Sequence, residues 1–524
     1  MKFVQHAASV AACLAAAVST PLSVTAQQLS GDYLMDDADI AFLGTAYLGR
    51  VGFSVSSAGD FNGDGFDDFL FSAPNAPPNS QFSGETFLLY GGAETGNGQR
   101  TLSPMDADVH FVGIEGQHAG YRVSSAGDLN LDGLDDLLIA TADFSERNKV
   151  YLVYGRPDAN QLTGEFQLSD SDATFVLERS SDPGPVGLTP AGDIDGDGAA
   201  DLLIGDYTYG SGYPGRAYLF YGNPDASLSG GIDIASADAT FDVDFRDGTL
   251  GYSVSSAGDL NGDGLDDVAI GALGQGEVYL YYGRPTSERI AGRIGRGEAD
   301  AVFSVYGAGR SLSTAGDLNG DGLNDLVIGA SDMDYNGEES GAAYLLYGKA
   351  GDNAWRGEID LDNADVRFEG VAEGDKAGYQ VSSAGDVNGD GIDDLLIGAY
   401  QAQGDPNDYA DGQQGGKTYL VYGRRGGVLD EAVYDLDNAD AVFIGGYRDF
   451  IGSAVDSTGD LNGDGLADIV LGAHASDTVR LSEGAVYIFY GRPVPEPSAA
   501  VLTIAAAAAF SSTFRGKPVC QFSE

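Results

Sequence analysis

The chain has 524 residues and a formal net charge of −53, because 80 acidic residues outweigh 27 lysines and arginines. This charge excludes partners that need a basic surface, such as nucleic acids and anionic membrane surfaces. Apolar residues make up 43% of the sequence and aromatic residues 10%, so the chain can bury a core and is not a disordered acidic protein.

The N-terminal segment has the features of a secretory signal peptide. Lys2 supplies a positive charge, residues 7–18 are apolar, and small residues precede Gln27. We therefore expect residues 1–26 to be a signal peptide and the protein to be exported. The only cysteines are Cys13 and Cys520, so the body of this exported chain contains no disulfide framework.

One acidic segment recurs seven times between residues 32 and 491. Its first copy reads Asp-Phe-Asn-Gly-Asp-Gly-Phe-Asp-Asp over residues 60–68. The seven copies begin at Asp60, Asp128, Asp193, Asp259, Asp317, Asp386 and Asp460. The 58 to 74 residues between consecutive copies are too many for a helical solenoid and suit a four-stranded blade.

Each unit contains four predicted strands. Residues 251–258 exemplify the strand before the acidic segment, and 394–399 the continuously apolar strand after it, which suits burial on both faces. A third strand such as 278–282 ends in Tyr-Gly, and a fourth such as 364–369 begins near an Asp-Ala-Asp-like sequence. Seven such units predict an all-β fold, a seven-bladed β-propeller of four-stranded blades.

The repeat region does not begin and end at the boundary of a complete four-strand unit. The region begins with a fourth-type strand at residues 38–43 and ends with a third-type strand at residues 486–490. We therefore expect the N-terminal strand to join the last blade as its outer strand. This closure would remove the open sheet edges at the seam and replace the missing disulfides.

A Gly-Ala pair ends the second strand in the last four units, at residues 271–272, 329–330, 398–399 and 472–473. Together with the acidic loop, this pattern resembles FG-GAP repeats, which build the N-terminal propeller of integrin α chains and of many bacterial surface proteins. The first three units depart from the Gly-Ala element. The resemblance covers residues 32–491 and implies ligand binding on the face opposite the acidic loops.

The acidic loops have the composition of calcium sites. Calcium takes six to eight hard oxygen ligands, and residues 1, 3 and 5 of a tight loop can point at one ion. Glycine at position 6 permits the sharp turn. The backbone carbonyl of position 7 and the acid at position 9 complete the set. The predicted ligands are Asp60, Asn62, Asp64, Phe66 and Asp68; Asp128, Asn130, Asp132, Leu134 and Asp136; Asp193, Asp195, Asp197, Ala199 and Asp201; Asp259, Asn261, Asp263, Leu265 and Asp267; Asp317, Asn319, Asp321, Leu323 and Asp325; Asp386, Asn388, Asp390, Ile392 and Asp394; and Asp460, Asn462, Asp464, Leu466 and Asp468.

Two other calcium-binding motifs have similar loops but do not fit this sequence. An EF-hand needs a glutamate at position 12, where this sequence has strand residues such as Phe71. Dockerin-type modules place two such loops close together, unlike the wide spacing here. A polar turn without metal remains open, because Asp, Asn and Gly are ordinary turn residues. We expect up to seven structural Ca²⁺ ions. Loop two matches the calcium-loop sequence least well, because Leu131 replaces the usual glycine at position 4. The acid at position 8 is expected to face solvent and not to be a ligand.

The loops between the second and third strands vary most. Blade six has the longest, residues 401–416, and blade five carries Asp332-Met-Asp334-Tyr-Asn336-Gly337, a partial second calcium loop. Loops on a rigid scaffold are a natural place for recognition. No G-x-S-x-G segment, zinc-type histidine pair or phosphate-binding loop occurs in the sequence, so no catalytic residues are assigned.

The composition changes after residue 491. Residues 492–524 contain Pro-Glu-Pro, a short apolar run at 499–510, and then Arg515 and Lys517. This order resembles the PEP-CTERM sorting tail, which implies processing at a Gram-negative-type envelope and transient membrane contact. The apolar run is shorter than the ~20 residues of a membrane span.

We interpret the sequence as a secreted or cell-surface calcium-binding propeller that binds a protein or polysaccharide. An extracellular enzyme on a propeller, such as a polysaccharide lyase or phosphodiesterase, is the alternative, since a fold does not decide function. A purely structural envelope protein is the third reading.

Overall fold

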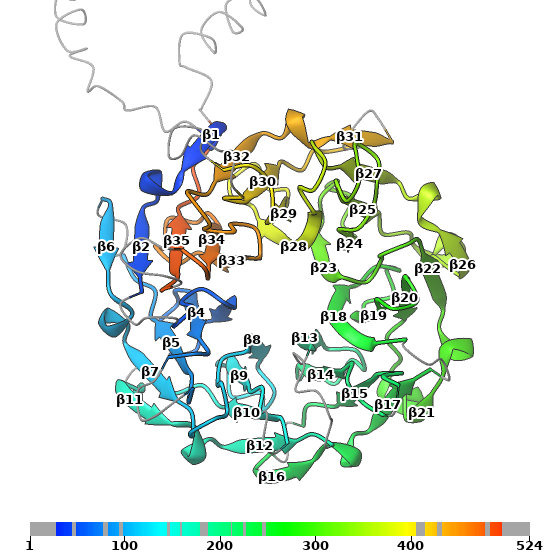
Figure 1. Cartoon of the computed structure of the whole chain (residues 1–524). Helices are drawn as coiled ribbons and strands as arrows, with labels where there is room; N and C mark the ends of the chain where they lie inside the picture. Colours follow the sequence, from blue (N-terminus) through cyan, green and yellow to red (C-terminus); the bar gives the residue numbers. More distant parts are fainter. Residues whose placement is uncertain are drawn as a thin grey trace, which may run out of the picture. The chain divides into compact units, whose positions relative to one another are not determined.

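Seven small β-sheets surround a central opening (Figure 1). The computed structural model describes residues 28–494, except 45–48, 77–81, 94–97, 144–146, 158–159, 179–186, 211, 224–226, 244–247, 405–413, 427–431 and 477–482. The sheets lie in one unit, Leu29–Gly491. The all-β, seven-bladed propeller expected from the repeat is confirmed. The signal peptide and the sorting tail lie outside the described residues.

Each blade contains four antiparallel strands, which in blades one to six follow chain order from the central opening outward. Blade one contains β3 (Val55–Gly59), β4 (Asp68–Ala73), β5 (Glu85–Leu89) and β7 (Val109–Val112). Blade two contains β8 (Arg122–Gly127), β9 (Asp136–Ala140), β10 (Lys149–Val153) and β12 (Ala173–Val176). Blade three contains β13 (Gly187–Gly192), β14 (Asp201–Asp206), β15 (Arg216–Phe220) and β17 (Ala239–Asp242).

The remaining blades repeat this order. Blade four contains β18 (Leu250–Gly258), β19 (Asp267–Ala272), β20 (Glu277–Tyr281) and β22 (Ala301–Ser304). Blade five contains β23 (Ser311–Gly316), β24 (Asp325–Ala330), β25 (Ala342–Leu346) and β27 (Val366–Glu369). Blade six contains β28 (Ala377–Gly385), β29 (Asp394–Ala399), β30 (Lys417–Val421) and β32 (Ala441–Ile444). Blade seven contains β33 (Ala454–Gly459), β34 (Asp468–Ala473), β35 (Ala485–Phe489) and β2 (Ile40–Leu43).

Each sheet also has a fifth, outermost strand that the sequence did not reveal. It is short, it runs parallel to the fourth strand, and it comes from the following unit, except that β1 precedes all the units. In order from blade one, these strands are β11 (Gly164–Gln167), β16 (Gly230–Asp233), β21 (Gly292–Ile294), β26 (Gly357–Asp360), β31 (Val433–Asp435), β1 (Gly31–Leu34) and β6 (Arg100–Leu102). Neighbouring blades are therefore linked through their outer edges.

A single 3₁₀ turn carries the chain from each fifth strand to the next fourth strand. These turns are η1 (Met35–Asp37), η2 (Pro104–Asp106), η4 (Leu168–Asp170), η5 (Ile234–Ser236), η7 (Arg296–Glu298), η9 (Leu361–Asn363) and η10 (Leu436–Asn438). Two further turns, η6 (Thr286–Glu288) and η8 (Gly351–Asn353), lie in connections that follow third strands.

The ring closes as the sequence predicted. Strand β2 pairs antiparallel with β35, with Ile40 opposite Ile488 and Leu43 opposite Ala485. The Asp39 carboxylate also accepts a hydrogen bond from the backbone N–H of Tyr490 at 2.9 Å. Strand β1 pairs with β32 of blade six, so the N-terminal segment joins two blades.

The second strand of each blade forms the centre of the core. Every residue of β4, β9, β14, β19, β24, β29 and β34 is buried. Large side chains pack between blades, as where the ring of Phe42 lies 4.8 Å from that of Phe71. Burial on both faces explains the continuous apolar runs in these strands, and it fixes the ends from which the acidic loops project.

Candidate metal sites in the acidic loops

Each acidic loop joins the inner strand of a blade to its second strand, so all seven loops lie on the same face of the ring. In loop one, both carboxylate oxygens of Asp60 accept backbone N–H bonds. Gly63 and Asp64 donate to Oδ1 at 2.7 and 3.0 Å, and Gly65 donates to Oδ2 at 3.0 Å. The position-1 carboxylate thus stabilises the turn by accepting three backbone hydrogen bonds from it.

Positions 3 and 5 of loop one are held by the same kind of contact. Asn62 Oδ1 accepts the N–H of Asp64 at 2.8 Å, and Asp64 Oδ1 accepts the N–H of Phe66 at 3.0 Å. The loop therefore gathers side-chain oxygens of positions 1, 3 and 5 around one turn. The position-7 carbonyls stay predicted ligands.

The position-9 acids are the most buried members of the predicted set. All seven are 0% exposed. One oxygen of each accepts the backbone N–H of loop position 2 at 3.0–3.2 Å. The other accepts the N–H of the glycine after the third strand, at 2.8–2.9 Å. This second contact ties the end of the third strand to the acidic loop in every blade.

Burial also shifts the acidity of these groups. Burial raises the pKa of Asp68 to about 8, and the carboxylates of Asp64 and Asp60 raise it further, against the backbone donors that lower it. The pKa of Asp394 rises to about 9 for the same reason. Within the described part of the chain, none of the seven position-9 acids forms an ion pair with lysine or arginine.

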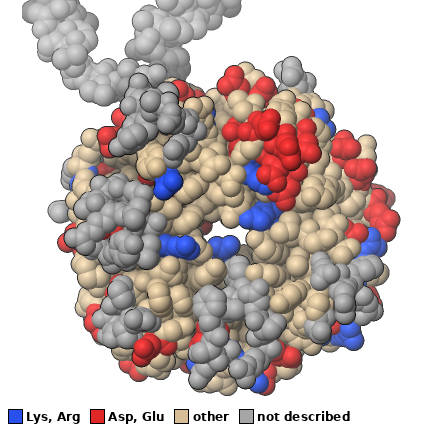
Figure 2. All heavy atoms as spheres, viewed as in Figure 1, with Lys and Arg blue, Asp and Glu red and all other residues tan. Residues whose placement is uncertain are grey.

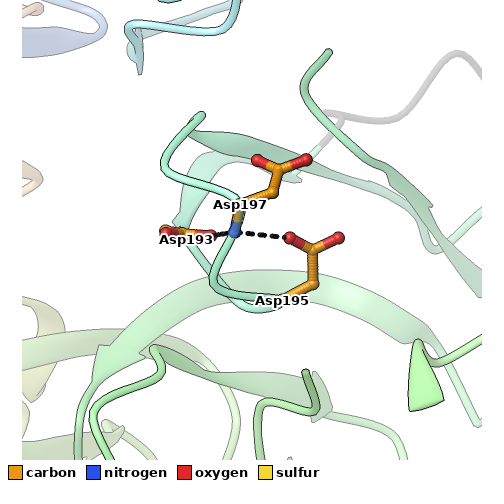
Figure 3. Close-up of side chains that lie close together, drawn as sticks. All are labelled: Asp193, Asp195 and Asp197. Atoms are coloured by element: carbon orange, nitrogen blue, oxygen red, sulfur yellow. Dashed lines mark hydrogen bonds between the residues drawn. The ribbon is translucent and has the colours of Figure 1, made fainter. Parts of the chain in front are cut away.

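Loop three differs from the others because position 3 is an acid. Ligand atoms of Asp193, Asp195 and Asp197 all lie within 4.8 Å of one another. Figure 3 shows the N–H of Asp197 between the carboxylates of Asp193 and Asp195, at 3.1 Å from each acceptor oxygen. This is the one loop in which the described residues bring three acids so close.

A guanidinium group reaches loop three from the segment after β20. Arg289 forms an ion pair with the buried Asp195, and its Nη2 lies 2.7 Å from Asp197 Oδ2. Its guanidinium carbon also lies 4.5 Å from the ring centre of Tyr221. The extra negative charge of this loop is therefore matched by an internal cation.

Loop two keeps its shape despite Leu131 at position 4. Leu131 adopts φ 55°, in the left-handed region that Gly63 occupies in loop one with φ 75°. This conformation costs about 1 kcal/mol or more for a residue with a Cβ. Asp128 still accepts the N–H groups of Asp132 and Gly133 at 3.0 and 2.8 Å. The substitution thus strains the loop without unfolding it.

The position-8 acids are not solvent-facing, so that expectation is wrong. Asp135 of loop two accepts the backbone N–H of Asp60 in loop one at 3.0 Å. At four other seams, the position-8 side chain of one loop likewise accepts the backbone N–H of position 1 in the preceding loop of the ring, at 2.7–3.1 Å. The side chains of loops four, five, six and one contact loops three, four, five and seven, respectively. Position 8 is an acid or Asn324 at these five seams and alanine at the other two, Ala200 and Ala467. These side chains link neighbouring blades.

A glycine at the end of each inner strand makes room for this contact. A Cβ built on Gly59 would lie 2.1 Å from Asp135 Oδ2, and Gly59 also has φ 60°. The inner and second strands have a register shift at this point in every blade. The bulge and the missing side chain together bring adjacent loops into contact.

The partial second loop of blade five is engaged in other contacts. Lys376 Nζ lies 2.8 Å from Asp332 Oδ1 and 2.9 Å from Glu339 Oε2. Asp334 accepts the N–H of Glu339 at 2.7 Å. A lysine ammonium thus pairs with Asp332, the first acid of this partial loop. Most of the long blade-six loop, residues 405–413, lies outside the described residues.

Sequence reasoning missed one residue that breaks the repeat. Four residues before each acidic loop, six blades carry serine or threonine and blade seven carries Asp456. Burial raises the pKa of Asp456 to about 6, although the Ser382 hydroxyl lowers it by hydrogen bonding. Comparing the seven units position by position would have found this substitution.

The acidic-loop geometry defines a class, a propeller with one oxygen-rich hairpin per blade. The family model for the FG-GAP repeat matches residues 51–89, 250–281, 308–346, 377–421 and 452–489. Each matched segment runs from near the inner strand of a blade, through the acidic loop, to the third strand. Five segments of the propeller are therefore similar to the FG-GAP repeat.

Individual relatives agree with this assignment. Integrin alpha-PS2 of Drosophila melanogaster is 31% identical over 263 residues, covering 47% of this chain and 16% of that protein. Integrin alpha-5 of Xenopus laevis is 30% identical over 249 residues, or 45% of this chain and 21% of that protein. Phosphatidylinositol-glycan-specific phospholipase D of Rattus norvegicus is 30% identical over 209 residues, or 36% and 24%. The chain spans no more than 24% of these three relatives.

Within the part of the chain that the structure describes, no helix has the length and apolar character needed to cross a membrane.

Proposed function

We propose that this protein is an exported, calcium-stabilised propeller that binds an extracellular protein or polysaccharide. Calcium has a structural role in the acidic loops, and the opposite face carries the ligand. The similarity to integrin alpha chains supports a binding or adhesion role. Residues 1–26 direct export, and residues 492–524 act as a sorting tail at a Gram-negative-type cell surface.

The seven buried position-9 carboxylates carry this proposal. Each is removed from water and has no lysine or arginine partner among the described residues. A buried charge is costly unless it is paired. A divalent cation held by the oxygens of positions 1, 3, 5 and 9 would supply the missing positive charge, and such hard oxygen donors fit Ca²⁺. Affinity in the range typical of extracellular modules, about 10⁻⁴ to 10⁻³ M, is expected.

Chelation tests the calcium role. Thermal unfolding should be followed by circular dichroism in millimolar calcium, in chelator, and in chelator followed by excess calcium. We expect a loss of many degrees in Tm that calcium restores and an equal concentration of magnesium does not. An unchanged melting curve in chelator would contradict the calcium proposal.

A glycan and surface-protein binding array, run with and without calcium, tests the binding role. We expect retention of the folded protein on a subset of ligands. A variant in which residues 334–339 of the blade-five loop are replaced by a short Gly-Ser linker should bind less, while its Tm stays unchanged. Turnover of an array ligand that one blade-specific substitution abolishes would instead favour an enzyme.

A further inference from the structure

The inner strands enclose a cavity of about 370 Å³ at the centre of the ring. Residues from the inner strands of all seven blades line it. Its volume falls in the range of small-molecule sites, roughly 300–1,000 Å³. On the face drawn in Figure 2, lysine and arginine side chains gather around the central opening.

Two arginines line this cavity at the ends of their strands farthest from the acidic loops, Arg122 of blade two and Arg310 of blade five. Arg50 lies nearby, because it and Arg122 both act electrostatically on the Tyr121 hydroxyl. Among the described residues, none of these three arginines has a carboxylate within ion-pair distance. Unpaired guanidinium groups at one opening are notable in a chain of charge −53.

Aromatic rings accompany these arginines. The guanidinium carbon of Arg310 lies 4.1 Å from the ring centre of Tyr379 and 5.5 Å from that of Tyr252. The rings of Phe53 and Tyr121 lie 4.8 Å apart. Stacking on the tyrosines holds the Arg310 guanidinium in place without neutralising it. The mouth therefore offers fixed cationic donors beside aromatic surfaces.

Deeper in the cavity, the seven repeat-equivalent side chains form a ring. They are Ser56, Ser124, Thr189, Ser255, Ser313, Ser382 and Asp456. The first five donate their hydroxyl protons to the carbonyl of the next residue, at 2.5–3.0 Å. Ser382 donates to Asp456 Oδ1 at 2.7 Å. Because these protons are used, the ring presents oxygen lone pairs and one carboxylate, which together accept hydrogen bonds.

We propose that the mouth of this channel binds a sugar acid, a uronic acid unit of a saccharide. The carboxylate of the ligand pairs with Arg122 and Arg310, since guanidinium groups bind carboxylates through two parallel hydrogen bonds. The sugar hydroxyls donate to the acceptor ring below. Asp456 repels a second acid at that depth, which fixes the ligand with its charged end outward. This inference rests on the proposed binding function and names a ligand class for it.

Titration calorimetry on the calcium-loaded full-length protein tests the proposal. The probes are glucuronate, an oligoglucuronate, glucose, glucose phosphate and acetate. We expect glucuronate to bind. Glucose should not bind because it lacks the carboxylate, and acetate should not bind because it lacks the sugar hydroxyls. Tighter binding of the oligosaccharide would identify a chain end as the source, and equal binding would identify the free sugar acid.

Matched variants localise the binding. Arg122→Gln and Arg310→Gln should each weaken glucuronate binding by about tenfold or more, the usual effect of losing a charge-assisted hydrogen bond. Arg448→Gln, at an exposed arginine elsewhere, should leave it unchanged. Asp456→Ser restores the side chain that five other blades carry and should weaken binding severalfold without unfolding the protein.

Three results would overturn the proposal: no glucuronate binding, equal binding of acetate or glucose phosphate, or equal effects of the Arg122, Arg310 and Arg448 substitutions. Retention on the binding array by the Arg122→Gln variant, with no glucuronate binding by either protein, would refute the sugar-acid site while leaving the proposed binding function standing.

Discussion

At the level of single residues, each repeated side chain in this propeller makes a specific contact. The aspartate near the start of the fourth strand accepts the N–H of the third-strand tyrosine in all seven blades, at 2.9–3.1 Å. The glycine after that tyrosine donates to the position-9 acid. The repeat is therefore maintained by hydrogen bonding between its strands and its acidic loops.

The position-8 contact between blades can be tested at Asp393, which accepts the N–H of Asp317 at 2.8 Å. Asp393→Ala should lower the free energy of unfolding by about 1 kcal/mol, because it leaves a backbone donor without its partner. Asp393→Asn should keep most of the stability, since Asn324 makes the same contact naturally at 3.1 Å. Urea denaturation in excess calcium measures both. Equal losses for alanine and asparagine would contradict the assignment.

Loop three offers a second test at residue scale. Arg289→Gln removes the guanidinium that pairs with Asp195 and Asp197 and leaves three acids without a counter-charge. We expect this variant to bind one more calcium ion than the parent protein, as counted by elemental analysis after dialysis. Arg284→Gln, in the same segment but 3.8 Å from Asp300, is the control. An unchanged calcium count would show that Arg289 does not compete with an ion.

Asp456 predicts a pH dependence of stability. Its folded pKa of about 6 lies above the ordinary aspartate pKa of 3.8, so ionisation disfavours the folded state. Below about pH 4 the carboxyl is neutral, so Asp456 does not lower the free energy of unfolding. As pH rises through 6 the carboxyl ionises, and the free energy of unfolding falls. Asp456→Ser should therefore be more stable than the parent at pH 7, by about 1–2 kcal/mol, and nearly equal at pH 4. A stability difference that is constant with pH would contradict this reasoning.

At the level of elements, the sequence predicted the four main strands of each blade because their periodicities differ. Buried second strands are continuously apolar, and predicted residues 394–399 coincide with β29. The fifth strands were missed because they are three or four residues long and pair with a different unit. The position-8 contacts and Arg289 were missed for the same reason: their partners lie in a neighbouring blade, which local spacing cannot reveal.

The ring closure by β2 can be tested at Phe42, which is 0% exposed and packs on Phe71. Phe42→Ala should lower the free energy of unfolding by about 3–5 kcal/mol, the usual cost of emptying a buried aromatic site. Tyr306→Ala, at a side chain that is 75% exposed, should have little effect. Chemical denaturation compares them. A small loss at Phe42 would mean that β2 does not hold the last blade.

At the level of the whole molecule, the large negative charge is concentrated in part around the acidic loops on one face. Each bound calcium ion would make the formal charge of −53 less negative by two. The metal-free protein should therefore suffer from repulsion between its own carboxylates. Repulsion of this kind is screened by salt.

This repulsion predicts a salt effect that depends on calcium. Raising the ionic strength from about 0.01 M to about 1 M shortens the Debye length from ~30 to ~3 Å. In chelator, Tm should rise markedly over this range, whereas in saturating calcium it should change much less. Differential scanning calorimetry with sodium chloride provides the measurement. Equal salt dependence in both conditions would indicate that the loops do not carry the unbalanced charge.

The pairing of residues 31–43 with strands of blades six and seven also determines when the ring can close. This segment is synthesised before any blade, yet its partners are β32 of blade six and β35, the last described strand of the chain. The contact between Asp39 and Tyr490 spans 451 residues of chain. Because their partners are made so late, β1 and β2 stay without these pairings during most of synthesis, and such distant pairings also form slowly. An interruption before residue 489 would leave an open ring with a free strand edge that another chain could occupy.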